Sequence, residues 1–143
     1  MLQFATLALV IGARYAGVGW PGAFSGGAAV AGVILAGVGL VLAVAGGRTL
    51  GRSLTPLPKP RAGATLRRGG VYRLVRHPIY GGVILMAAGW SLGSAPLGLV
   101  PTAALVGVFT FKARREETWL LAHYADYAEY RARTPRRLLP WLL

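Results

Sequence analysis

Long apolar runs dominate the chain between residues 2 and 111, separated by two short turns and one long basic segment at residues 48–77. These runs cover residues 2–20, 28–47, 78–92 and 97–111. A helix needs about 20 apolar residues to cross a hydrocarbon core of about 30 Å, which the first two runs provide. The last two runs are shorter and need local thinning of the bilayer or support from flanking residues. The pattern predicts an all-α membrane protein with about four transmembrane helices.

Small residues recur at intervals of four within the second run. They form two series, Ala28–Gly32–Ala36 and Gly39–Ala43–Gly47. Small residues at this spacing allow helix backbones to approach closely in a membrane. Because Ala and Gly are abundant in the whole chain, an unspecific apolar filler is the alternative interpretation.

Charge is concentrated in two segments. The chain has 16 Lys and Arg, four acids and a net charge of +12, with eight basic residues in 48–76 and seven in 112–137. The turns after residues 20 and 92 carry no charge. The positive-inside rule therefore predicts a multi-pass protein of the cell (inner) membrane with both charged segments and both termini cytoplasmic. A basic chain can also bind nucleic acid, but basic residues that flank apolar spans favour contact with membrane lipid instead.

Composition excludes several kinds of chemistry. The 143-residue chain has no cysteine and only two histidines. Disulfides, thiolate nucleophiles and cysteine–zinc sites are therefore excluded, and no metal site is expected. The length predicts a single domain, residues 1–143.

The segment from Gly69 to Gly82 joins the basic loop to the third apolar run. A residue before proline is disfavoured in the α region, whereas proline suits the first turn of a helix. We therefore expect residues 72–77 to form an ordered loop and a helix to continue from Ile79. Tyr80 then lies in the first turn, close to His77 and Arg76. The alternative is a basic and aromatic anchor at the membrane interface.

The C-terminal part predicts an amphipathic helix. Between Glu116 and Arg133, apolar and aromatic residues recur at steps of three and four, and Thr134-Pro135 should end the helix. We expect the helix of the fourth run to continue past Glu117. The apolar segment 138–143 is expected to lie in the membrane interface.

Two blocks together resemble a known family. The first is Arg76-His77-Pro78-Ile79-Tyr80 after Gly70-Val71-Tyr72; the second contains Glu116-Glu117, a run of tyrosines and Arg133-Thr134-Pro135. Their order is similar to that of isoprenylcysteine carboxyl methyltransferases and their phospholipid methyltransferase relatives. On this resemblance the site is built from residues 64–80 and 112–135, with a cytoplasmic loop that covers the cofactor.

The resemblance implies an integral membrane methyltransferase dependent on S-adenosylmethionine. The residues that match the cofactor-binding positions of the family are Thr65, Leu66, Tyr72, His77, Pro78, Ile79, Tyr80 and Glu116. The family arginine four residues before the glutamate pair is Lys112 here, so Lys112 and Arg76 are the expected catalytic residues. Lysine is a point charge where arginine offers a planar fork, which bears on the identity of the substrate.

Methyl transfer from a sulfonium requires alignment and exclusion of water rather than a nucleophile or a metal. The expected acceptor is a carboxylate of the isoprenylcysteine kind or another apolar-tailed, lipid-like molecule; an amine must first lose a proton. One alternative is an NADPH-dependent enzyme of the sterol reductase kind, which would have Asn at position 79 and no glutamate pair. Another is a non-catalytic protein that binds anionic lipid through its basic loops.

Overall fold

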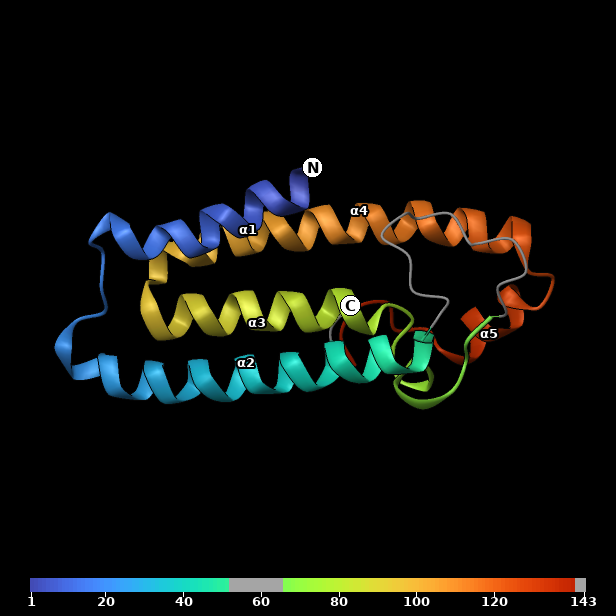
Figure 1. Cartoon of the computed structure of the whole chain (residues 1–143), viewed down its shortest axis with the longest axis horizontal. Helices are drawn as coiled ribbons and strands as arrows, with labels where there is room; N and C mark the ends of the chain where they lie inside the picture. Colours follow the sequence, from blue (N-terminus) through green and yellow to red (C-terminus); the bar gives the residue numbers. More distant parts are fainter. Residues whose placement is uncertain (52–65, 141–143) are drawn as a thin grey trace. The chain divides into compact units, whose positions relative to one another are not determined.

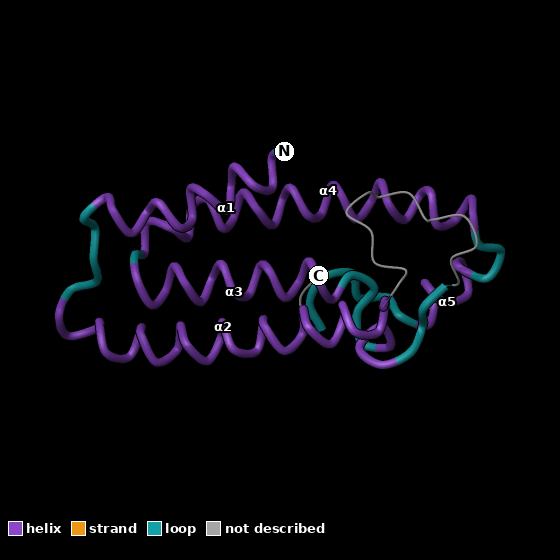
Figure 2. The backbone as a smooth tube through the Cα atoms, viewed as in Figure 1, coloured by secondary structure: helices purple, strands orange, loops and turns teal. Residues whose placement is uncertain are grey.

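The computed structural model describes residues 1–51 and 66–140 as helices joined by loops (Figure 1). The described residues contain no strand (Figure 2), so the predicted all-α class is confirmed for them. The elements in chain order are α1 (Leu2–Gly12), η1 (Ala13–Ala16), α2 (Gly22–Leu50), η3 (Gly70–Arg73), α3 (Pro78–Ser94), η4 (Pro96–Gly98), α4 (Leu99–His123) and α5 (Tyr127–Arg133).

Two stretches of the described chain are long and apolar enough to cross a membrane, judged by length and composition. They are α2 and the stretch Pro96–His123, which consists of η4 and α4. The stretch Leu2–Ala16 is apolar but shorter, and α3 has 17 residues. The four-span topology and the cytoplasmic orientation of the charged segments therefore stay predictions.

The first helix ends earlier than the apolar pattern predicts. After η1 the chain leaves the helix at Gly17, which has a left-handed φ of 72°. A left-handed residue stops a right-handed helix, and glycine adopts it without a steric cost. The helical stretch thus ends at Ala16, four residues before the apolar run ends at Trp20. Instead, the Trp20 indole Nε1–H donates a hydrogen bond of 2.8 Å to the Leu92 carbonyl.

The chain forms two compact units. The first unit comprises Met1–Val41 and Gly82–Phe109, and the second comprises Leu42–Gly81 and Thr110–Leu143. Helices α2, α3 and α4 each contribute residues to both units. Each unit is described by itself below, and the single-domain organisation stays a prediction.

Glycine allows α2 and α3 to approach closely within the first unit. A Cβ added to Gly32 would lie 2.5 Å from the Gly89 carbonyl oxygen, and one added to Gly39 would lie 2.6 Å from the Gly82 carbonyl oxygen. The predicted close approach is therefore confirmed for Gly32 and Gly39. It is not confirmed for Gly47, where a Cβ would meet nothing within 4 Å.

Two buried hydroxyls stabilise the turn between α3 and α4. Ser91 Oγ donates to the Ala87 carbonyl at 2.8 Å and lies 3.1 Å from Thr102 Oγ1. Thr102 Oγ1 in turn donates to the Gly98 carbonyl at 2.8 Å. A buried hydroxyl is costly unless it is hydrogen-bonded, and both meet this condition.

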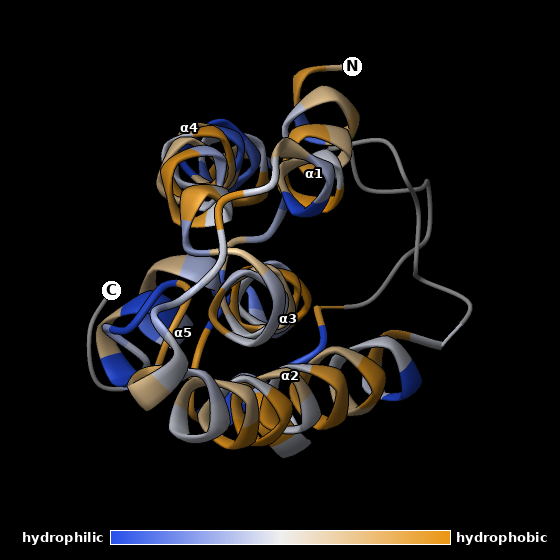
Figure 3. Cartoon of the chain, turned by 90° about the vertical axis from the view of Figure 1, so that its left-hand side faces the viewer, coloured by the Kyte–Doolittle hydropathy of each residue, from blue (hydrophilic) through white to orange (hydrophobic). Residues whose placement is uncertain are grey.

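Large apolar side chains of the N-terminal helices face outward in the first unit. Figure 3 shows the hydrophobic residues along α1 and α2. Phe4, Val33 and Ile34 are all more than 60% exposed, at 65%, 74% and 62% respectively. Exposed apolar surface of this extent is typical of contact with lipid or with another protein.

In the second unit the predicted continuation of the fourth helix is confirmed, because α4 extends to His123. The expectation of one unbroken amphipathic helix over 116–133 is wrong. A turn at residues 124–126 separates α4 from α5, and the Tyr127 N–H donates across it to the Tyr124 carbonyl at 3.1 Å. Asp126 at this turn forms an ion pair with Arg68. Helix α5 ends before Thr134-Pro135, as predicted.

Candidate functional site

The predicted motif begins with a tight glycine turn in the second unit. Gly70, the first residue of η3, has a φ of +57°, a value that L side chains rarely adopt. A Cβ at this position would also lie 3.1 Å from Thr49 Oγ1. The Thr49 hydroxyl itself donates to the Ala45 carbonyl at 2.8 Å. Glycine at position 70 therefore permits both the positive φ of the backbone and the close approach of this turn to Thr49 on α2.

Helix α3 begins at Pro78, which confirms the predicted start of the third helix. The two residues before it are fixed by the C-terminal segment. The Arg76 N–H donates to the Arg136 carbonyl at 3.0 Å, and the His77 N–H donates to the Arg137 carbonyl at 2.8 Å. These two bonds place the C-terminal segment directly beside the motif.

The C-terminal segment continues along the first turn of α3. A Cβ at Gly81 would lie 2.0 Å from the Leu138 carbonyl oxygen, so only glycine fits there. Leu138 itself is buried, with 1% of its surface exposed. The expectation that the apolar tail lies in the membrane interface is therefore wrong for Leu138, which packs inside the protein; residues 141–143 lie outside the described residues.

Glu117 accepts hydrogen bonds from three cationic or ionisable side chains. Arg76 Nε donates to its Oε1 at 2.8 Å, and His77 Nε2 lies 3.2 Å from the same oxygen. Arg137 donates from Nε at 3.1 Å and from Nη2 at 3.2 Å, one bond to each carboxylate oxygen. Glu117 is only 3% exposed. We call Arg76, His77, Glu117 and Arg137 the Glu117 cluster; a buried carboxylate of this kind is stable because it is fully paired.

Glu116 lies on the other side of the same imidazole. Tyr80 Oη donates to Glu116 Oε2 at 2.8 Å, and His77 Nδ1 lies 3.7 Å from that oxygen. The His77 and Tyr80 rings are stacked, with centroids 5.4 Å apart and planes only 2° from parallel. The predicted proximity of Tyr80 to His77 is therefore confirmed. Lys112 Nζ lies 5.0 Å from the centroid of the Tyr80 ring, in a cation–π contact.

Buried tyrosines complete the second unit. Tyr130 Oη donates to the Tyr72 carbonyl at 2.7 Å. Burial raises the pKa of Tyr130 to about 12, so its hydroxyl stays protonated and keeps this donor role. Burial, followed by the charge of Glu116, also raises the pKa of Tyr72. Among the described residues, the buried Tyr127 hydroxyl has no hydrogen-bond partner.

The structure brings together five of the ten site residues that the sequence predicted. His77, Tyr80, Lys112 and Glu116 form one connected set of contacts, and Glu117 links Arg76 to it. Among the other expected cofactor residues, Tyr72 and Pro78 are buried, whereas Leu66 and Ile79 are half-buried. No contact of Leu66 with this set is shown, and Thr65 lies outside the described residues.

Sequence reasoning gave no role to Glu117, Arg137 or Tyr127. For Glu117 the signal was present in the glutamate pair, but the sequence did not indicate which of the two carboxylates is buried. For Arg137 the sequence offered no signal, since its position depends on main-chain hydrogen bonds between distant segments. The spacing of Tyr127 in the sequence indicates only a residue on the inward face of a helix, and its hydroxyl without a hydrogen-bond partner among the described residues is evident only in the structure.

Over residues 1–51 and 66–140, the fold and the site are those of a helical protein with candidate membrane spans and an ionic cluster at the start of α3. The sequence model of the phospholipid methyltransferase family matches residues 28–127, from α2 to the start of α5. The chain therefore belongs to the phospholipid methyltransferase family, a membrane-associated family of methyltransferases, which confirms the predicted relationship. No curated protein and no solved structure matches the chain.

Proposed function

We propose that the chain is an integral membrane methyltransferase that uses S-adenosylmethionine and acts on an apolar-tailed acceptor. The observation that carries this proposal is the state of Glu116, whose side chain is 25% exposed. Its carboxylate accepts a hydrogen bond of 2.8 Å from the phenol of Tyr80 and lies 3.7 Å from His77 Nδ1. A carboxylate held by a neutral donor keeps its charge for a cationic ligand group.

The residues present fit the groups that S-adenosylmethionine would offer. Glu116 is suited to the ammonium of its amino acid portion, since an ammonium has three donors and no acceptor. The buried Tyr127 hydroxyl has unused hydrogen-bonding capacity, which is costly in a protein without a ligand or another partner. The aromatic faces of Tyr72 and Tyr80 are suited to apolar or aromatic parts of a ligand.

When bound, S-adenosylmethionine supplies a methyl group that its sulfonium has already activated. The protein residues hold the binding groups in position. Tyr80 and His77 orient Glu116 from one side. Glu117, fixed by Arg76 and Arg137, holds the opposite nitrogen of His77. The geometry supports a preorganised site in which side-chain positions are set before a ligand arrives.

We propose different roles for the two residues expected to be catalytic. Lys112, one helical turn before Glu116, is the residue that acts on the acceptor. Arg76 is 6% exposed and donates to Glu117 and to the Thr134 carbonyl, the latter at 2.6 Å. These contacts support a positioning role for Arg76, and its catalytic contact stays a prediction.

The acceptor we propose is lipid-like, which the family and the two candidate membrane spans support. A carboxylate acceptor of the isoprenylcysteine kind needs no base, whereas an amine must lose a proton before it reacts. Assays with a carboxylate and an amine on tails of equal length separate these two acceptors. The cytoplasmic location of the site is part of the same proposal, supported by the basic segments 48–76 and 112–137.

The proposal is tested by calorimetric titration of S-adenosylmethionine into the protein in detergent. Wild type should bind, and Glu116→Gln should bind about thirtyfold or more weakly, because the cofactor ammonium would lose its carboxylate in a partly buried site, and truncation of a hydrogen-bonded charge pair costs about 2–5 kcal/mol. Glu129→Gln is the matched control, since Glu129 is exposed and pairs only with Arg133 among the described residues. It should bind within about twofold of wild type.

Two results would contradict the proposal in different ways. If wild type binds no S-adenosylmethionine, the methyltransferase function with this cofactor is wrong, and a lipid-binding or NADPH-dependent protein takes its place. If Glu116→Gln and wild type bind equally, the cofactor assignment of Glu116 is wrong although the enzyme class stands.

A further inference from the structure

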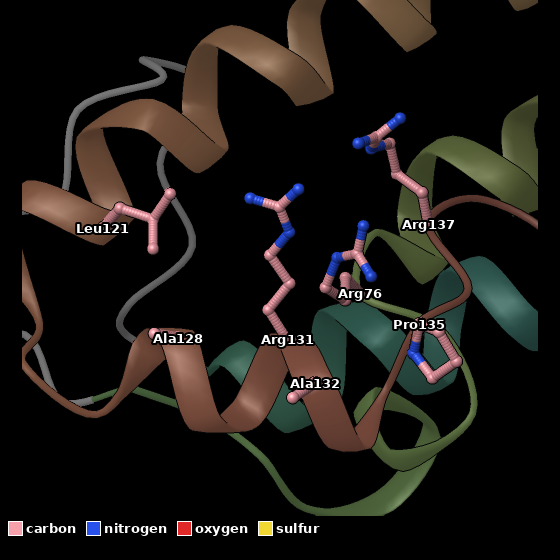
Figure 4. Close-up of a pocket in the computed structure, with 7 residues that line it drawn as sticks. All are labelled: Arg76, Leu121, Ala128, Arg131, Ala132, Pro135 and Arg137. Carbon is pink, nitrogen blue, oxygen red and sulfur yellow. The ribbon is translucent and has the colours of Figure 1, made fainter.

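A shallow pocket of about 540 Å³ lies in the second unit, beside the Glu117 cluster. Figure 4 shows the side chains of Arg76, Arg131 and Arg137 extending into the same space. The apolar part of the wall includes Leu121, Ala128 and Pro135. The pocket thus combines three guanidinium groups with an apolar wall.

The pocket carries an excess of positive charge. Three arginines line it, and the single carboxylate of Glu117, which pairs with two of them, offsets only part of their positive charge. Of the other three acids, Asp126 and Glu129 are paired with Arg68 and Arg133, and Glu116 contacts Tyr80 and His77 and does not line the pocket. The described acids therefore do not neutralise the pocket, and a small anion would lower its electrostatic energy.

The arginines also keep donors available. Arg76 uses Nε and Nη1 for Glu117 and Thr134, and Arg137 uses Nε and Nη2 for Glu117. A guanidinium has five N–H donors, so these bonds account for fewer than half of each set. Within the described chain Arg131 forms no ion pair, although Arg133, two residues later on α5, pairs with Glu129.

We propose that this pocket binds a phosphate group, independently of the methyl-transfer function proposed above. Guanidinium forks match phosphate oxygens in pairs, and a tetrahedral phosphate has enough oxygens for several arginines at once. A carboxylate has two oxygens and would leave some of the arginine N–H donors without an acceptor. The phosphate belongs either to a lipid headgroup, with the apolar part of the lipid in contact with Leu121, or to a free phosphate ion. We expect Arg131 to contribute most to binding of the anion, because it forms no ion pair within the described chain.

The experiment measures binding of three probes to the purified full-length protein in detergent. The probes are inorganic phosphate, dihexanoyl phosphatidylglycerol and zwitterionic dihexanoyl phosphatidylcholine. Arg131→Gln should weaken binding of the anionic probes about tenfold, because it removes charged hydrogen bonds. Arg131→Lys, which keeps the charge but loses the fork, should lie between wild type and Arg131→Gln.

Arg133→Gln is the matched control: the same change on the same helix, at a residue that does not line the pocket. It should bind within about twofold of wild type. Thermal unfolding of each variant confirms that it is folded. A loss of anion binding in Arg131→Gln but not in Arg133→Gln supports the proposal. If wild type binds phosphatidylglycerol more tightly than phosphate, the ligand is a lipid headgroup. If it binds the two equally, the ligand is a free phosphate. Equal losses in Arg131→Gln and Arg133→Gln, or no binding by wild type, would overturn it.

Discussion

Each of the two compact units is stabilised internally by a different kind of contact. In the first unit, α2 and α3 approach closely because Gly32, Gly39 and Gly89 have no side chains. In the second unit, the loop before α3, the end of α4 and the C-terminal segment are joined by Arg76, Glu117 and the main-chain bonds of residues 136 and 137. Close helix packing in the first unit thus requires positions without a side chain, whereas the second unit requires particular charged side chains. Substitutions that add a methyl group or remove a charge should therefore affect them differently.

The largest effect is expected at Glu117. Glu117→Gln leaves Arg76 and Arg137 without their carboxylate, and breaking a buried pair costs about 3–5 kcal/mol of unfolding free energy. The measurement is denaturant or thermal unfolding in detergent. Glu129→Gln breaks an exposed pair with Arg133 and should cost less than about 1 kcal/mol. If the two variants are equally stable, the Glu117 cluster does not stabilise the second unit.

The position of this cluster could be predicted only in part from the sequence. Proline after His77 correctly predicted a helix start, and the position of Tyr80 in the first turn correctly predicted that it lies close to His77. The parallel stacking of the two rings was not predicted. The helix start and the proximity are both local, and local chemistry determines them. The burial of Glu117 rather than Glu116 depends on how α4 is rotated relative to the loop, which neighbouring residues in the sequence do not encode.

The turn after α4 shows a second limit of sequence reasoning. Apolar steps at Leu120, Tyr124 and Tyr127 continue through residues 124–126, so periodicity predicts one helix where the structure has two. Hydrophobic periodicity records which residues face inward and does not record whether the backbone is continuous. The side chain of Asp126, at this turn, pairs with Arg68, which is 58 residues earlier in the chain. A local sequence pattern cannot predict an ion pair between residues so far apart in the chain.

A smaller effect is expected in the first unit. In Gly32→Ala the new Cβ would lie 2.5 Å from the Gly89 carbonyl oxygen and 2.7 Å from the Gly93 nitrogen, both backbone atoms. Overpacking of this kind costs about 1–3 kcal/mol, because the helices must separate. Unfolding in detergent measures the change. Cofactor affinity should change less than stability, since Gly32 belongs to the first unit and Glu116 to the second.

Gly37→Ala provides the control for this substitution. It introduces the same methyl group on the same helix, but a Cβ there meets nothing within 4 Å. Alanine also favours the helix by up to about 1 kcal/mol relative to glycine. Gly37→Ala should therefore be neutral or stabilising. A loss of stability equal to that of Gly32→Ala would show that helix conformation, and not the close approach of α2 and α3, determines the result.

Among the substitutions at Glu117, Gly32 and Lys112, the smallest change in free energy is expected at Lys112, although the effect on turnover should be large. The Lys112 ammonium lies over the Tyr80 ring, and Tyr80 donates to Glu116. Loss of a cation–π contact costs about 0.5–1 kcal/mol, so Lys112→Ala should weaken S-adenosylmethionine binding less than about sixfold. If Lys112 acts on the acceptor, turnover should fall further than affinity, and Lys112→Arg should restore much of it because the positive charge is kept. Calorimetry and a methyl-transfer assay on the same preparations separate the two quantities. An affinity loss as large as that of Glu116→Gln would mean that Lys112 belongs to cofactor binding, and unchanged turnover would remove it from the reaction.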